Sequence, residues 1–180
     1  MKQRLVWRTC LSVVLGLCTC ATTGRGQDGG AKKVDDQTFV KKVSAVDLVG
    51  TELGNLAAQR AMHDEVRRFA ETTMAYHGKS GAKLAALAEK AGLAVSTTAN
   101  KKHTELQRKL ADLKGVEFDR QYLSAVVKLH KEALKLFEGQ SRHGANTDLR
   151  KHAADVLPVL REQLRAAQEI GKKYGAKGGG

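Results

Sequence analysis

Cysteine is scarce, and all three cysteines, Cys10, Cys18 and Cys20, lie within the first twenty residues of this 180-residue chain. The rest of the chain therefore cannot form an internal disulfide bond and must be stabilised by packing alone. It also lacks a cysteine nucleophile, and no serine stands in an evident arrangement with a histidine and an acid. Nucleophilic catalysis has no support, and we expect a protein that is not an enzyme.

Aromatic residues make up only 4% of the chain, and no basic run is interleaved with them. Single-stranded nucleic-acid binders need that combination, so we expect no nucleic-acid partner. The net charge is +12, or about +9 without Lys2, Arg4 and Arg8 near the N-terminus. Lysine and arginine are spread over the polar faces of all the expected helices, which favours solvated surfaces. Contact with an anionic surface of the cell envelope is the alternative.

Long hydrophobic runs are also missing. The longest, residues 11–21, is about half of the ~20 residues that cross a bilayer as a helix. It follows the basic residues near the N-terminus and precedes small residues, which is the order of a secretory signal. We therefore predict a signal peptide over residues 1–26 and a location in the periplasm or cell envelope. A lipid anchor of the outer membrane, attached at Cys18 or Cys20, remains an alternative.

What the remaining sequence does have is helical periodicity. Apolar residues recur at helical spacing over residues 36–61, 64–91, 100–114, 117–144 and 147–170. The predicted N-caps are Asp35 or Asp36, Asp64, Thr98 or Asn100, and Thr147 or Asp148. Pro158 should kink the last helix. We predict an all-α, ferritin-like up-down four-helix bundle over residues 36–172, with an additional short helix between the second and third long helices.

The ends of that domain are rich in glycine. Residues 27–35 are predicted to form a flexible linker and residues 173–180 a disordered tail. Two segments of the chain are similar in sequence, DEVRRFAE at Asp64 and TDLRKHAA at Thr147. Both segments follow a short turn after a long helix, which is consistent with two helical hairpins packed as a pseudo-repeat.

Two histidines interrupt the apolar faces. His77 lies within the apolar arc of the second long helix, His130 within that of the third, and Glu52 at the border of the first. At 1.5 Å per residue from the hairpin turns, both histidines come out at ~22 Å, Glu52 at ~16 Å and Gln163 at ~27 Å. Facing helices of a bundle could therefore hold a transition-metal ion at Glu52, His77 and His130.

Buried hydrogen bonding is the alternative role for these two histidines, with Glu52, Gln163 or Tyr122 as the partner. The other four histidines lie near turns or helix borders and are expected to be solvated. They are His63, His103, His143 and His152.

The order of several sequence blocks resembles a bacterial family. The blocks are FVKKV at Phe39, ELGNLAAQRA at Glu52, VRRFAETTMAYH ending at His77, FDRQYLSAVVKLH ending at His130, ALKLFE at Ala133 and LPVLREQL at Leu157. Over about residues 37–170 the chain is similar to a ferritin-like domain-of-unknown-function family, often labelled predicted outer membrane proteins. The resemblance implies an envelope-located four-helix bundle with metal ligands at Glu52, His77 and His130, and it transfers no activity.

The chain departs from that family at three positions. Tyr76 and Leu129 stand where an acidic residue usually precedes each central histidine, and Gln163 replaces the usual histidine of the last helix. The Glu-x-x-His pairs of di-iron bundles are absent as well, which argues against a dinuclear iron centre. The sequence favours an exported, non-enzymatic helical binding or stress-related module. The alternative is a metal-binding protein with one transition-metal ion, such as iron, zinc or copper, inside the bundle.

Overall fold

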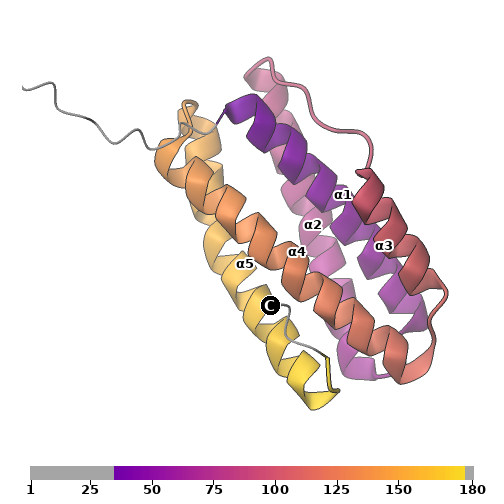
Figure 1. Ribbon diagram of the computed structural model, residues 1–180. Coiled ribbons are helices and arrows are strands. Elements are labelled where there is room, and N and C mark those ends of the chain that lie inside the picture. Colours follow the sequence, from indigo (N-terminus) through magenta and orange to yellow (C-terminus); the bar gives the residue numbers. More distant parts are fainter. Residues whose placement is uncertain (1–34, 177–180) are drawn as a thin grey trace, which may run out of the picture. The chain divides into compact units, whose positions relative to one another are not determined.

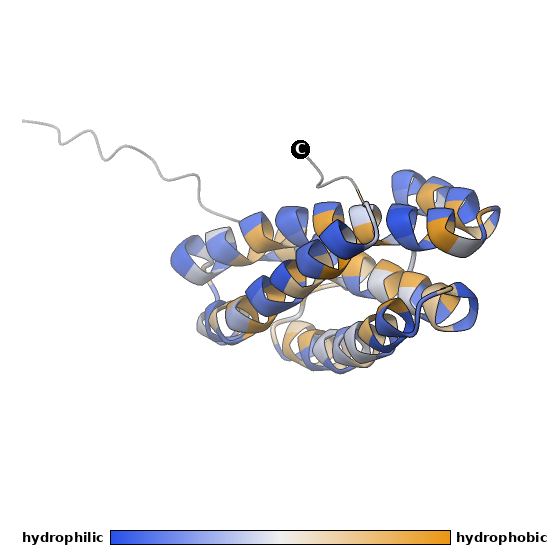
Figure 2. Ribbon diagram, turned by 90° about the horizontal axis from the view of Figure 1, so that it is seen from below, coloured by the Kyte–Doolittle hydropathy of each residue, from blue (hydrophilic) through white to orange (hydrophobic). Residues whose placement is uncertain are grey.

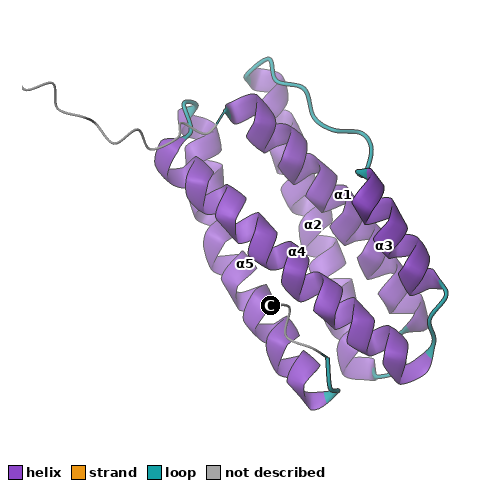
Figure 3. Cartoon of the chain, viewed as in Figure 1, coloured by secondary structure: helices purple, strands orange, loops and turns teal. Residues whose placement is uncertain are grey.

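A computed structural model describes residues 35–176 of the chain, and every regular element in this range is an α-helix (Figures 1 and 3). The predicted signal peptide and nearly all of the predicted linker lie outside the described residues. The helices are α1 (Asp36–Arg60), α2 (Asp64–Lys90), α3 (Lys101–Ala111), α4 (Gly115–His143) and α5 (Thr147–Lys173). The all-α prediction and the short extra helix between the second and third long helices are confirmed.

The four long helices form two antiparallel hairpins, α1 with α2 and α4 with α5, that pack side by side (Figure 1). Within the bundle α1 also contacts α4 and α2 contacts α5, while the short helix α3 lies against α1 and α4. Apolar positions face the interior and charged positions face outward (Figure 2). No helix among residues 35–176 is long and apolar enough to span a membrane.

Two buried or partly buried carboxylates tie the hairpins together reciprocally. Asp119 of α4 is fully buried and accepts hydrogen bonds from the backbone N–H groups of Met62 and His63 in the α1–α2 turn, at 3.1 and 3.0 Å. Asp36 of α1 accepts from the backbone N–H groups of Ala145 and Asn146 in the α4–α5 turn, at 3.1 and 2.7 Å. Each hairpin therefore supplies a carboxylate that accepts hydrogen bonds from the backbone N–H groups in the turn of the other. This exchange fits the predicted pseudo-repeat.

Helix caps agree with the sequence at two of four positions. Asp35 and Asn100 cap α1 and α3 through their side chains, as expected. The cap of α5 is Asn146, whose side chain accepts from the N–H of Leu149 at 3.0 Å, so the expectation of Thr147 or Asp148 is wrong by one residue or two. For α2 the cap position is His63, and Asp64 is already helical. Asp119 on the opposite hairpin accepts instead from the N–H groups of Met62 and His63, at the residues just before the helix.

The C-terminal end of the domain extends beyond the predicted boundary. Tyr174 stacks on His63 with ring centres 3.9 Å apart, and its hydroxyl donates to Glu65 at 3.0 Å. Gly175 has φ +74°, which lets the N–H of Ala176 reach the carbonyl of Gly171 at 2.7 Å and close α5. Lys173 and Tyr174 thus contact Glu65 and His63 at the start of α2, and the last four residues of the predicted tail lie outside the described part. Helix α5 is continuous through Pro158, which is exposed, and the kink predicted at this residue stays a prediction.

Candidate functional site

The first hairpin is unusually close-packed at two glycines of α1. A Cβ atom on Gly50 would lie 2.5 Å from Cδ2 of His77, and one on Gly54 would lie 2.6 Å from Cβ of Met74. Both distances are shorter than any contact that real side chains make, so only glycine fits at these positions. The missing side chain of Gly50 lets the ring of His77 lie directly against the backbone of α1, and the missing side chain of Gly54 does the same for Met74.

One turn away on α1, Asp47 holds this ring in place. Its Oδ1 atom lies 2.9 Å from Nδ1 of His77, and the two residues are 7% and 4% exposed. Burial raises the pKa of the Asp47 carboxyl, and the hydrogen bond to His77 opposes that rise. With Nδ1–H donating to the carboxylate, Nε2 of His77 keeps its lone pair and can bind a cation.

His130 of α4 is fixed in a similar way. It is 4% exposed, and its Nδ1 atom donates to the carbonyl of Val126 at 3.0 Å. Burial, followed by the neighbouring His77, lowers the pKa of His130 to about 4, so its imidazole is neutral near pH 7. A neutral ring that donates from Nδ1 has an unprotonated Nε2.

That second nitrogen faces another acceptor. Nε2 of His130 lies 3.1 Å from Oε1 of Gln163 on α5. Two acceptors at this distance repel each other unless a donor or a cation lies between them. Either the amide of Gln163 turns to present its NH2 group, or a positive ion joins the two atoms.

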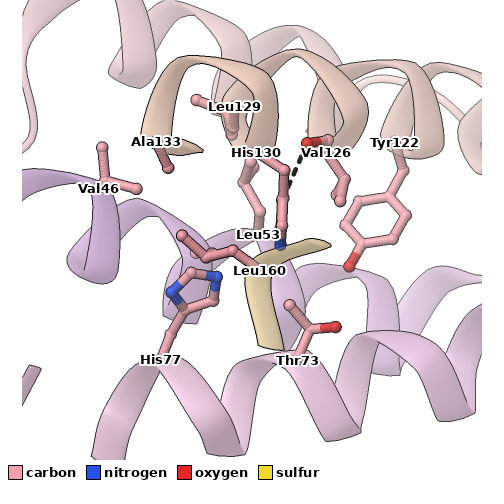
Figure 4. Close-up of a pocket in the computed structure, with 11 residues that line it drawn as sticks. Val46, Leu53, Thr73, His77, Tyr122, Val126, Leu129, His130, Ala133 and Leu160 are labelled. Atoms are coloured by element: carbon pink, nitrogen blue, oxygen red, sulfur yellow. Dashed lines mark hydrogen bonds between the residues drawn. The ribbon is translucent and has the colours of Figure 1, made fainter. Parts of the chain in front are cut away.

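The rings of His77 and His130 meet across the bundle, with centres 5.8 Å apart and planes inclined at 73°. Figure 4 shows them reaching toward one another from α2 and α4. They line a cavity of about 20 Å³, enough for a single water-sized particle. Thr73 and Tyr122 also line it, and Oγ1 of Thr73 is buried without a hydrogen-bond partner. Burial in this environment raises the pKa of the Tyr122 hydroxyl.

The structure brings together two of the three predicted ligands and not the third. His77 and His130 are level and adjacent, as the residue count indicated, whereas Glu52 is exposed. Asp47 replaces Glu52 as the carboxylate at His77, because Asp47 lies on the face of α1 that Gly50 and Gly54 press against α2. Within residues 35–176 no three His, Cys, Asp or Glu side chains converge so as to hold a metal ion. Of the predicted ligands Glu52, His77 and His130, only the two histidines therefore lie next to each other.

Among the partners suggested for the histidines, only Gln163 lies beside one of them, with its Oε1 atom 3.1 Å from Nε2 of His130. The expectation that the other four histidines are solvated is wrong for two of them, since His103 and His152 are 5% and 2% exposed. His63 is half-buried, and its Nδ1 atom lies 2.7 Å from Asp119, while His143 is exposed. Helical periodicity alone did not separate these positions, because all four lie near turns or helix borders.

Comparison with known families agrees with this architecture. The sequence profile of the family called Domain of unknown function (DUF4142) matches residues 21–170. The chain belongs to this family. No match was found among curated proteins.

Two solved structures are similar to this DUF4142 chain. One is a DUF305 protein from Streptomyces coelicolor that is inferred to be secreted, with a TM-score of 0.69 and 18% identity, covering 79% of this chain and 93% of that one. The other is a DUF305 fragment from Deinococcus radiodurans, with a TM-score of 0.68 and 14% identity, covering 76% and 95% respectively. These matches show the shared ferritin-like fold.

Proposed function

We propose that this DUF4142 protein is an exported, non-enzymatic binding module of the bacterial cell envelope that holds one transition-metal ion between His77 and His130. The observation that carries the proposal is the orientation of the two rings. In each, Nδ1 faces an acceptor, Asp47 Oδ1 at 2.9 Å or Val126 O at 3.0 Å, and Nε2 is left with its lone pair. Histidines that bind metals almost always have this arrangement, because a hydrogen bond to the distal N–H fixes the tautomer and the ring.

The distances between the groups fit one shared ion. Two imidazoles that each bind an ion at about 2.0–2.1 Å place their ring centres roughly 5–6.5 Å apart, and the observed separation is 5.8 Å. Two ligand atoms of one tetrahedral ion lie roughly 3.0–3.5 Å apart, and Nε2 of His130 lies 3.1 Å from Oε1 of Gln163. An ion between these atoms would relieve the repulsion between the two acceptors.

The ligand set supports a mononuclear site of modest affinity. Two imidazoles and the amide oxygen of Gln163 supply three ligands, and the small cavity has room for one ion and not for a second. Imidazole ligands suit zinc, copper and iron. Asp47 would balance part of the positive charge through His77 without touching the ion.

Export rests on the sequence of the first 26 residues, with three basic side chains before an apolar run. The inferred secretion of the Streptomyces coelicolor DUF305 protein supports export. An ion site fits a binding or stress-related role, because the chain has no evident nucleophile for catalysis. An outer-membrane lipid anchor at Cys18 or Cys20 is compatible with this role.

The test is the metal content of protein purified without chelators, measured by mass spectrometry for the wild type and for His77→Ala and His130→Ala. His143→Ala is the matched control, because His143 is exposed at the end of α4. We expect about one metal ion per chain in the wild type and in the control, and a loss in both core variants while circular dichroism shows them folded. A wild type that stays empty and also fails to bind added zinc, copper or iron would leave the two histidines as core hydrogen-bonding groups.

A further inference from the structure

A larger hollow lies on the outside of the bundle, away from the two core histidines. It has a volume of about 600 Å³, within the usual range of small-molecule sites. Helix α3 lies against α1 and α4, and the loop before it runs from the end of α2 to the start of α3 (Figure 1). The lining residues come from α1, the 91–100 loop, α3 and α4, and the charged ones among them are Lys41, Lys42, Lys102, Glu132 and Lys135.

The charge of this groove is strongly positive. Four lysines and one glutamate line it, which gives a net charge of +3 (four minus one). Glu132 forms an ion pair with Lys102 at 3.2 Å. The other three lysines, Lys41, Lys42 and Lys135, are exposed and form no ion pair within residues 35–176.

The N-terminal end of α3 adds to the positive potential. This eleven-residue helix begins with Lys101 and Lys102 and has no acidic residue in its first turn. Cations at a helix N-terminus are unfavourable, since the macrodipole is positive there, and the N–H groups of the first turn favour an anion. Asn100 caps only the N–H of His103.

A buried polar group points to a ligand in the same place. His103 lines the groove, is only 5% exposed, and its Nδ1 atom is buried without a hydrogen-bond partner. Buried polar atoms in native proteins are nearly always paired, and this unpaired nitrogen belongs to a side chain in the wall of the groove, where a bound ligand would supply a partner. Burial and the adjacent Lys102 lower the pKa of His103.

The floor of the groove is apolar, formed by Ala45, Val46, Ala99 and Leu136. Because the rim is cationic and the floor is hydrocarbon, we propose that this groove binds an amphipathic organic anion, a carboxylate with a medium-length alkyl chain. The carboxylate would lie at the N-terminus of α3, among Lys42, Lys102 and Lys135, and the chain would cover the apolar floor. This site is separate from the His77–His130 pair and does not depend on metal binding.

The experiment is a titration of the full chain with decanoate, followed by calorimetry and by NMR of the His103 imidazole. Decanol tests whether the charge is needed and acetate whether the alkyl chain is needed. We expect 1:1 binding of decanoate with a shift of the His103 resonances, and binding at least tenfold weaker for both decanol and acetate.

Charge-neutral variants locate the site. In Lys42→Gln/Lys135→Gln we expect decanoate affinity to fall about tenfold or more. The matched control, Lys79→Gln/Lys172→Gln, removes the same charge from exposed positions outside the groove and should bind like the wild type. Circular dichroism checks that both variants are folded.

Three outcomes would overturn the proposal. Equal binding of decanol and decanoate would show that the lysines do not recognise a negative head. Equal weakening in the control variant would mean that only net charge matters. Binding to phosphatidylglycerol vesicles without any binding of free decanoate would indicate a membrane-surface contact instead of a pocket.

Discussion

The burial of His152 makes a quantitative prediction about stability and pH. This residue of α5 is 2% exposed, and neither of its ring nitrogens has a hydrogen-bond partner. Burial, followed by the charge of Lys83, lowers its pKa from 6.5 to about 4, and Asp155 opposes the shift weakly. The folded protein therefore resists a proton that the unfolded chain accepts readily.

The direction follows from proton binding in the two states. As the pH falls below 6.5 the unfolded chain takes up a proton at His152 first, so the free energy of unfolding decreases until the folded pKa of about 4 is passed. Above pH 6.5 the full stability is present. The whole shift corresponds to on the order of 3 kcal/mol, of which roughly 2 falls between pH 7 and pH 5. Because the nearby charges of Lys83 and Asp155 are exposed and screened by solvent, we discount this to about 1.5 kcal/mol.

The assay is urea unfolding at pH 7 and pH 5, comparing the wild type with His152→Leu. Leucine keeps the site apolar and removes the titrating group, so the variant should lose about 1.5 kcal/mol less than the wild type on acidification. Contributions from other groups, including His130, are common to both proteins and cancel in the difference. His143→Leu, at an exposed position, serves as the control and should behave like the wild type. An equal loss in the wild type and in His152→Leu would refute the claim that His152 is buried and neutral.

Three further changes test the packing. Gly50→Ala should destabilise the fold by about 1–3 kcal/mol in urea unfolding, since the new methyl group would overlap the His77 ring, and unchanged stability would contradict the close approach of α1 and α2. Gly78→Ala should stabilise by about 1 kcal/mol, because its methyl group meets open space on a helix; a loss would show that the site is strained. Asp119→Ala should cost about 2–4 kcal/mol, because it leaves the N–H groups of Met62 and His63 unpaired, and hydrogen exchange at those amides should accelerate.

The helices could be predicted from sequence because their signals are local. Apolar spacing, glycine at the ends and the caps Asp35 and Asn100 all act within one turn of the chain. The contact that holds the turn before α2 could not be found in this way, because its acceptor is Asp119, more than fifty residues away.

The candidate site was predictable in its depth along the helices but not in its choice of carboxylate. Counting residues from the turns places His77 and His130 at one level, but the choice between Glu52 and Asp47 depends on how α1 is rotated against α2. Gly50 and Gly54 set that rotation, and their four-residue spacing was the available signal in the sequence. Asp47 lies within one turn of Gly50 and therefore shares its face.

The central claim is that Nε2 of His77 and Nε2 of His130 bind one ion. The most direct measurement is long-range 1H–15N NMR of the imidazole nitrogens, recorded while zinc is added to metal-free protein. We predict that both Nε2 resonances shift together and saturate at one equivalent of zinc, while both Nδ1 nitrogens remain protonated in their bonds to Asp47 and Val126. Unchanged Nε2 resonances at saturating zinc, or a proton found on either Nε2, would contradict the account.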